Sequence, residues 1–392
     1  MRWPAVALLA GIVGTARSGY GAGSGEAWAD SAAESNVGGA AAGSAAAAAS
    51  KSSWRGSAAL FDQSVSTQTV GLGADYQSAD PTYEWWVALK PRYFAYEDRV
   101  QSVSLNGWAN LYYELTSSDT TTRKNELVVG PTWLWAYYGR TLFERGELKT
   151  SMVVGPRLTL PTDKASRASG LLVGLGAAAG LTQALPISRG NAPLFRSARL
   201  GLNVIYSHPM SRATTPVDPG LDRIRQDAAG RTFLSDQLRG SMNVQHELRV
   251  VVSSGIQITQ KLGLSLSYVF FNYWDHEPPE TPICTATTGC IMPGRADDPT
   301  RYRVSTWAIG SIDYDVIDEM SIGFGYYNLT AQIGPDGQRR NPLWSPDARI
   351  FLTVTGNLDA IYDALAKGDD KRTEASSRGQ PGPGEPKGAS GF

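Results

Sequence analysis

The sequence predicts an all-β protein, a transmembrane antiparallel up-and-down β-barrel of about 12 strands. Two observations predict this fold class. Segments of roughly ten residues that alternate apolar with small or polar side chains recur between residues 67 and 355, and a membrane barrel alternates lipid-facing apolar residues with interior polar ones in this way. In addition, no stretch reaches the roughly 18 apolar residues that a membrane-spanning helix requires.

The composition agrees with one large barrel rather than with several soluble domains. The 392 residues carry a formal charge of −1, which gives no support for a nucleic-acid partner because such binders show a strongly basic patch. The chain contains 11 Trp and 17 Tyr at an ordinary hydrophobic content of 42%. This combination is typical of membrane barrels, which have a polar interior and aromatic rings at both membrane interfaces.

The first 29 residues are expected to form a secretory signal peptide. A cationic Arg2 precedes a short apolar run that ends at Val13, and this run is too short to span a bilayer. The small residues Ala27 and Ala29 favour cleavage before Asp30, with an alternative earlier site at Ala22. Export without membrane helices, followed by the strand pattern, predicts the bacterial outer membrane as the location.

Residues 30–66 are rich in Ala, Gly and Ser, and we expect them to form a flexible leader. Within it, the segment 54–66 is open between leader and an additional strand. The barrel itself is expected over residues 67–355. Its strands are predicted over residues 67–77, 84–95, 103–115, 126–138, 147–160, 170–183, 196–207, 245–259, 262–274, 302–315, 319–330 and 346–355. The count is even, as bacterial single-chain barrels generally have.

The connections between these strands alternate in length in the second half of the chain. Long polar segments run over 208–244, 275–301 and 331–345, whereas 260–261 and 316–319 are short. Barrels of this kind have short periplasmic turns and long external loops, so a periplasmic amino terminus places all three long segments outside. The aromatic residues of 270–274 then fall at the external interface. Trp133, Trp135 and Tyr137 are expected at the periplasmic interface.

The tail and the two cysteines complete the predicted organisation. Residues 356–392 leave the strand pattern and are expected to form a largely disordered periplasmic tail, in which 358–365 could form a short amphipathic helix. Cys284 and Cys290 lie in one loop of an exported protein, which favours a disulfide because that compartment is oxidising. No further Cys or His ligands occur at matched spacing, so no metal site and no cofactor is expected.

Alternation also assigns charged side chains to the barrel interior. The predicted inward basic residues are Lys90, Arg92, Lys149, Arg157, Arg199, Arg249, Arg303 and Arg349, and the predicted inward acids are Asp75, Glu114, Glu126, Asp313 and Asp315. A basic interior favours the passage of anionic solutes, because a low-dielectric channel focuses the field of its charges. The alternative is that these groups pair across strands and fill a narrow interior. The excess of bases over acids cannot be neutralised by pairing within this set alone.

Over residues 67–355 the chain resembles bacterial outer-membrane β-barrel proteins of the porin and transporter kind, without a specific subfamily. The segment from Leu158 through Pro161 to Asp163 is similar to a Leu-x-Leu-Pro-Thr-Gly segment of outer-membrane proteins associated with aromatic-compound degradation operons, with Asp163 in place of the Gly. The resemblance implies a passive channel or transporter for small solutes, surrounded by outer-membrane lipid. It leaves the oligomeric state open.

Two other classes of function compete with a channel. One is a non-transporting surface barrel whose long loops at 208–244 and 275–301 bind a partner. The other is an outer-membrane lipid hydrolase, since the phospholipases and lipid A deacylases of this architecture use Ser and His near the external rim. The chain offers only His208, His246 and His276 there, without a serine-rich motif of that family's spacing, so we expect no enzyme.

Overall fold

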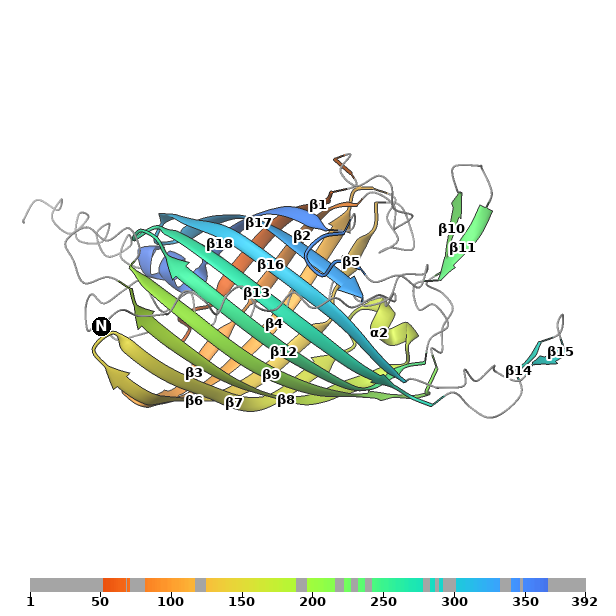
Figure 1. Ribbon diagram of the computed structural model, residues 1–392, viewed down its shortest axis with the longest axis horizontal. Helices are drawn as coiled ribbons and strands as arrows, with labels where there is room; N and C mark the ends of the chain where they lie inside the picture. Colours follow the sequence, from red (N-terminus) through yellow and green to blue (C-terminus); the bar gives the residue numbers. More distant parts are fainter. Residues whose placement is uncertain are drawn as a thin grey trace, which may run out of the picture.

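The computed structural model of the protein contains a closed antiparallel β-barrel. The structure describes residues 52–67, 69–70, 82–116, 125–187, 196–215, 222–226, 232–236, 242–277, 283–285, 289–291, 301–331, 340–345 and 348–365. The predicted signal peptide, Asp75 and most of the tail lie outside these residues. Figure 1 shows the strands steeply tilted around the barrel axis, as closure of a sheet into a cylinder requires.

The barrel wall is a single sheet of 14 strands. At two positions of the wall one strand is interrupted and counted as two. β2 and β3 both pair with β4 and are separated by Pro91. β5 and β6 also both pair with β4 and are separated by Gly130 and Pro131. Proline has no N–H to donate to the ladder, which explains both breaks. Counting each interrupted pair once leaves the 12 strands that the sequence predicts.

The strands follow the chain around the wall and close it where β1 pairs with β18. Their bounds are β1 Ala58–Ser66, β2 Tyr83–Lys90, β3 Arg92–Glu97, β4 Gln101–Glu114, β5 Leu127–Val129, β6 Thr132–Arg145, β7 Leu148–Leu160, β8 Leu171–Pro186, β9 Ser197–Ser211, β12 Val244–Gln257, β13 Leu262–Asp275, β16 Tyr302–Ile317, β17 Met320–Ala331 and β18 Arg349–Asn357. Eleven of the 12 predicted strands coincide with these within a few residues.

The first strand differs from the prediction. It lies at Ala58–Ser66, within the segment that is open between leader and an additional strand, and Thr67, Thr69 and Val70 form a turn where the strand over 67–77 is expected to begin. Its inward face carries Asp62, Ser64 and Ser66, so only the outward Phe61 and Val65 and the inward Leu60 mark it as a strand. These polar inward residues make the segment resemble the leader in composition. The barrel therefore begins nine residues earlier than predicted.

The outer face of the barrel is apolar. Large hydrophobic side chains are exposed at every second position of the strands on all sides of the wall. They include Trp85, Val87, Leu89, Leu105, Leu134, Leu175, Leu181, Leu200, Leu202, Val252, Leu266, Phe324 and Leu352. A band of this extent would be insoluble in water and is the surface that a barrel presents to lipid. In the described part of the chain, no helix is long and apolar enough to cross a membrane.

The two ends of the barrel differ. The short connections β3–β4, β6–β7, β12–β13 and β16–β17 lie at one end, which we take as periplasmic. The opposite, external end carries the short helix α2 (Lys164–Ala168) and two separate hairpins, β10–β11 (Asp222–Gln226, Thr232–Asp236) and β14–β15 (Ile283–Thr285, Gly289–Ile291). Asp163, which departs from the resembled segment, caps α2 by accepting a hydrogen bond from the Ser166 N–H.

Two features at the ends bear on earlier expectations. A helix over 358–365 follows β18, as predicted, and Figure 1 shows it in blue at the periplasmic end. The Leu358 N–H donates to the Ser57 carbonyl, which ties this helix to the start of β1. Cys284 and Cys290 are direct partners in the register of the β14–β15 hairpin. Their side chains lie outside the described part, so the disulfide stays a prediction.

Candidate functional site

The barrel interior contains a continuous apolar cluster rather than an entirely polar lining. The cluster is built from inward-facing residues of eleven of the 12 barrel strands and comprises Leu60, Trp86, Ala88, Trp108, Trp133, Trp135, Tyr137, Ala178, Ile205, Val251, Val269, Phe271, Trp307, Tyr327 and Phe351. Its rings contact one another: Trp108 lies 5.3 Å from Trp86 and 6.5 Å from Trp133, measured between ring centroids. We call this set the aromatic layer.

The aromatic layer corrects the predicted position of three rings. Trp133, Trp135 and Tyr137 are buried inside the barrel and do not form a lipid-facing girdle at the periplasmic interface. The exposed partner on the same strand is Leu134. Both faces of β6 are apolar, so hydrophobicity alone cannot decide which face is inside. The large rings occupy the interior because it has to be filled by side-chain volume, whereas lipid adapts to any apolar surface.

At the external interface the prediction is partly confirmed. Phe270 and Trp274 are exposed on the outer face of β13, and Trp274 packs against Tyr302 with ring centroids 5.3 Å apart. Phe271 and Tyr273, of the opposite parity, point inward and stack at 6.1 Å. Only every second ring of the 270–274 cluster therefore faces the membrane.

Besides Arg92, whose guanidinium carbon lies 4.4 Å from the Phe94 ring centroid, four inward arginines lie over aromatic rings of the interior. The distances from the guanidinium carbon to the ring centroid are 5.3 Å for Arg157 over Trp133, 5.4 Å for Arg249 over Phe271, 5.7 Å for Arg303 over Tyr273 and 5.9 Å for Arg349 over Tyr327. A cation within about 6 Å of a ring centroid is attracted by the negative face of the ring. The arginines and the aromatic layer thus form one surface inside the barrel.

The predicted interior residues fall into two groups. Lys90, Arg157, Arg249 and Glu114 are buried in the barrel, and Arg92, Arg199 and Asp313 are partly buried there. Arg303 and Arg349 also lie inside, whereas Lys149, Glu126 and the exposed Asp315 lie at the strand ends. Lys149 is exposed at the periplasmic start of β7, 3.7 Å from Glu144. Glu126 precedes β5 at the external end, where its carboxylate lies 2.6 Å from Lys164 Nζ. The predicted inward residues are therefore buried or partly buried in the middle of the strands, whereas at the ends Lys149 is exposed and Glu126 pairs with Lys164.

Acidic residues that the sequence analysis did not single out partner several of these arginines. Glu247 accepts from Arg249 Nε at 2.6 Å and from Nη2 at 3.0 Å, and Asp275 pairs with Arg303 at 2.6 Å. Glu84 pairs with Arg349. The signal was available from parity, since Glu84 lies six residues before Lys90 and Glu247 lies two before Arg249. Arg249, Arg303 and Arg349 are therefore each paired with an interior carboxylate, as the pairing alternative expects.

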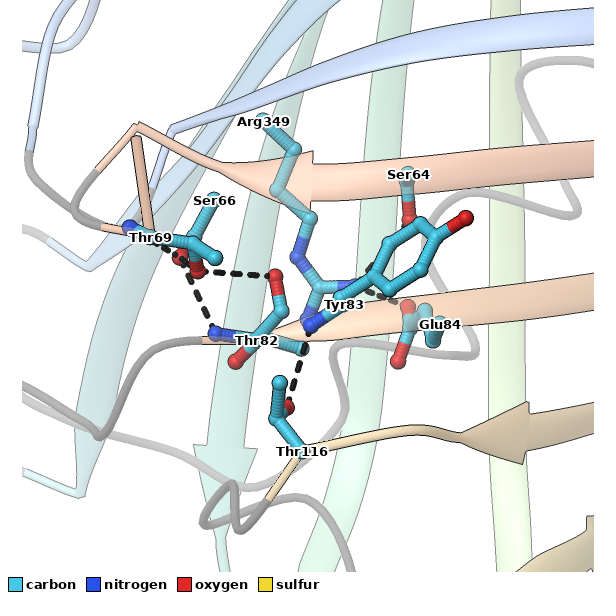
Figure 2. Close-up of polar contacts among 8 residues, drawn as sticks. All are labelled: Ser64, Ser66, Thr69, Thr82, Tyr83, Glu84, Thr116 and Arg349. Carbon is cyan, nitrogen blue, oxygen red and sulfur yellow. Dashed lines mark hydrogen bonds and ion pairs between the residues drawn. The ribbon is translucent and has the colours of Figure 1, made fainter. Parts of the chain in front are cut away.

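Figure 2 shows the external end of this interior, where β1, β2 and β18 meet. Arg349 Nη1 contacts Glu84 and lies 3.5 Å from the Ser64 hydroxyl, so its guanidinium bridges the inner face of β1 between its two neighbours. Above it, the Ser66 and Thr69 hydroxyls are 2.8 Å apart, and the Thr82 N–H donates to Ser66 Oγ at 3.1 Å. These bonds join the end of β1 to Thr82, the residue before β2.

The three histidines of the chain gather at the external rim. His208 ends β9, His246 begins β12 and His276 follows β13; the rings of the first two stack with centroids 5.0 Å apart. Burial, and secondarily the nearby His208 and His246, lower the pKa of His276. The Nδ1 atoms of His208 and His246 contact the Gln245 carbonyl and the Tyr206 hydroxyl, and neither contact is the serine–histidine hydrogen bond of a hydrolase. Within the described residues, no group of three or more His, Cys, Asp and Glu side chains is arranged to hold a metal ion.

A closed antiparallel barrel with an apolar outer face, short turns at one end and long loops at the other defines a transmembrane barrel of the bacterial outer-membrane class. No protein-family model matches the chain, and no curated protein matches it. Three solved structures with which it aligns are all outer-membrane barrels or their transport units, at identities of 9–10%.

The first is an outer-membrane channel from Pseudomonas putida F1, with 10% identity, a TM-score of 0.42 and coverage of 79% of this chain and 99% of that one. The second is the transport unit of the autotransporter AIDA-I from Escherichia coli, with 10% identity, a TM-score of 0.35 and coverage of 86% and 98%. The third is the NanC porin, with 9% identity, a TM-score of 0.34 and coverage of 76% and 98%. The class of this protein rests on its own barrel geometry.

Proposed function

We propose that the barrel is a narrow, selective channel for small solutes of the outer membrane. The observation that carries this proposal is the surface of inward arginines over aromatic rings, which includes Arg157 over Trp133 at 5.3 Å. Structural stability alone does not require buried cations inside a barrel, because replacing ion pairs by apolar residues of similar volume is often neutral or stabilising. A conduit for anions, in contrast, requires them.

The same surface defines the selectivity that we propose. Guanidinium groups attract anions and reject cations, while the surrounding rings offer a flat apolar surface to the uncharged part of a solute. Arg157, Arg199 and Arg249 lie on β7, β9 and β12, which belong to one side of the wall, so their charges line that side of the path. Because Arg249 is paired with Glu247, its net contribution is smaller than that of Arg199, for which no ion pair is seen among the described residues.

A second candidate is a non-transporting barrel, and one observation favours it. The rings of the aromatic layer are almost fully buried: Trp108 is 1% and Trp307 0% exposed. An interior packed in this way leaves little room for solutes in the conformation described here. In that case the external hairpins β10–β11 and β14–β15 are the functional parts, and they bind a partner outside the cell.

Conductance in planar lipid bilayers separates these candidates. We expect the wild-type barrel to give small, discrete current steps, with a reversal potential that indicates anion preference in a KCl gradient. Arg157→Glu together with Arg199→Glu should weaken or reverse that preference. Arg140→Glu is the matched control, since Arg140 is exposed on the outer face of β6. A folded but electrically silent barrel would rule out the channel, and unchanged selectivity in the double variant would rule out the role of these arginines.

A further inference from the structure

His208 and His246 are directly opposed on the outer face of the wall. The β9–β12 ladder ends with Ser207 opposite Glu247, and His208 and His246 occupy the next position beyond it, where their rings contact each other. Directly opposed residues on one face of an antiparallel pair have Cβ atoms about 4.5–5.5 Å apart. The two imidazole rings accordingly stack, with centroids 5.0 Å apart and an interplanar angle of 29°.

One nitrogen of each ring is already held by an oxygen partner. His208 Nδ1 lies 2.7 Å from the Gln245 carbonyl oxygen. Because a carbonyl only accepts, this Nδ1 carries the proton of the neutral ring and Nε2 keeps its lone pair. His246 Nδ1 lies 2.8 Å from the Tyr206 hydroxyl, whose oxygen accepts a hydrogen bond from Nδ1–H when Nε2 is a ligand. Histidines that bind metals have this arrangement, in which the second nitrogen donates to an oxygen that orients the ring.

We propose that His208 and His246 form a binding site for a divalent transition-metal ion, with their two Nε2 atoms as ligands and water in the remaining positions. Imidazole nitrogen suits Cu²⁺, Zn²⁺ and Ni²⁺, and Cu²⁺ binds most tightly among the divalent ions of the first transition row. Both rings are partly exposed, so the ion can reach them from solution. The site lies on the outward face at the external rim and is separate from the proposed conduit.

The two ligands fit this chemistry better than a packing role. His208 and His246 stand at positions where the outer face of the barrel elsewhere carries apolar or aromatic residues, such as Tyr206 and Trp274. Two stacked imidazoles gain little from each other in the absence of an ion, and protonation makes them repel. A bound cation converts this pair into a cross-link between β9 and β12 beside the loop that contains the β10–β11 hairpin.

The test uses the folded full-length barrel in detergent, purified without a polyhistidine tag because the chain itself has only three histidines. Isothermal titration with CuCl₂ and with ZnCl₂ should show saturable binding of one ion per chain, and Cu²⁺ electron paramagnetic resonance should show coupling to two nitrogens. His208→Gln and His246→Gln should each weaken binding at least about tenfold. Tyr206→Phe should weaken it by about 10-fold or more, as the loss of an outer partner does.

His276→Gln is the matched control, since it removes the third imidazole of the rim and leaves the opposed pair intact. We expect it to bind as the wild type does; loss of binding would overturn the two-ligand assignment. Binding that persists in the His208→Gln, His246→Gln double variant would place the ion elsewhere, for example at Cys284 and Cys290, and would overturn the site. Heat-modifiable migration on gels verifies that every variant is folded, so a wild-type barrel that is folded but binds neither ion also refutes the proposal.

Discussion

Two stretches of the barrel wall differ in the size of the side chains that they place in the interior. On β2, β4 and β6 the inward positions carry the large rings Trp86, Trp108 and Trp133, whereas on β8 they carry Gly174, Gly176, Ala178 and Gly180. Ala178 belongs to the same apolar cluster as the rings. The small residues thus leave volume that side chains from the neighbouring strands occupy, and the two stretches depend on each other.

The glycines of β8 are required by close approach of the neighbours. A Cβ added at Gly176 would lie 2.4 Å from the Tyr206 carbonyl oxygen, and one at Gly180 would lie 1.9 Å from the Asn203 side-chain oxygen. The first obstacle is backbone of β9 and cannot rotate away. These glycines therefore leave room for the backbone of β9 at Gly176 and for the Asn203 side chain at Gly180. Gly170 differs, because it follows α2 in the left-handed region at φ 78°.

The largest effect is expected where the aromatic stretch is weakened. Trp108→Ala removes a buried ring that contacts both Trp86 and Trp133, and should lower the free energy of unfolding by about 3–5 kcal/mol. Urea titration of the barrel in lipid vesicles, followed by tryptophan fluorescence, measures this loss. If the aromatic layer is also what narrows the path, the same variant raises the single-channel conductance.

Trp85→Ala is the control for that prediction. Trp85 is 41% exposed on the outer face of β2, next to the buried Trp86, so its removal leaves no cavity inside the barrel. Its cost should be clearly smaller, and the conductance should stay at the wild-type value. Equal losses for Trp85 and Trp108 would contradict the distinction between a packed interior and an adaptable lipid face.

The small-residue stretch can be tested by adding volume. Gly176→Val forces its side chain against the backbone of β9 and should destabilise the barrel by about 1–3 kcal/mol. Ala177→Val provides the matched control at the next position, which is exposed on the outer face. A β-branched residue suits an exposed strand position, so this change should be neutral. Comparable stability of the two variants would show that the close approach of β8 and β9 is not limiting.

Much of this architecture could be predicted from the sequence, because the alternation of apolar and polar residues identifies the strands of the wall and the loop lengths separate its two ends. The strand count and the orientation follow from such local signals. The first strand is open between leader and strand in the sequence, since Asp62 and Ser64 give it the composition of the leader. The position of Trp133 could not be decided either, because both faces of β6 are apolar and the sequence does not show which of them must be filled.

The contacts of the candidate sites depend on the register between neighbouring strands, which cannot be read from the sequence. Arg249 and Phe271 are directly opposed across β12 and β13, and His208 meets His246 across β9 and β12 with a long loop between them. A shift of one residue in either ladder would turn these side chains to opposite faces. Spacing rules for metal or catalytic motifs therefore miss them, while a pairing diagram of the barrel reveals them at once.

The smallest effect is expected outside the wall, in the β14–β15 hairpin. Because Cys284 and Cys290 are direct partners across it, we expect a disulfide, and mass spectrometry of the unreduced protein should find both thiols blocked until reduction. The bond closes only a short loop that is separate from the barrel sheet. Cys284→Ser with Cys290→Ser should therefore leave barrel unfolding unchanged within about 0.5 kcal/mol while making the hairpin more sensitive to proteolysis. Free thiols in the oxidised wild type, or a large loss of barrel stability, would contradict this separation of hairpin and wall.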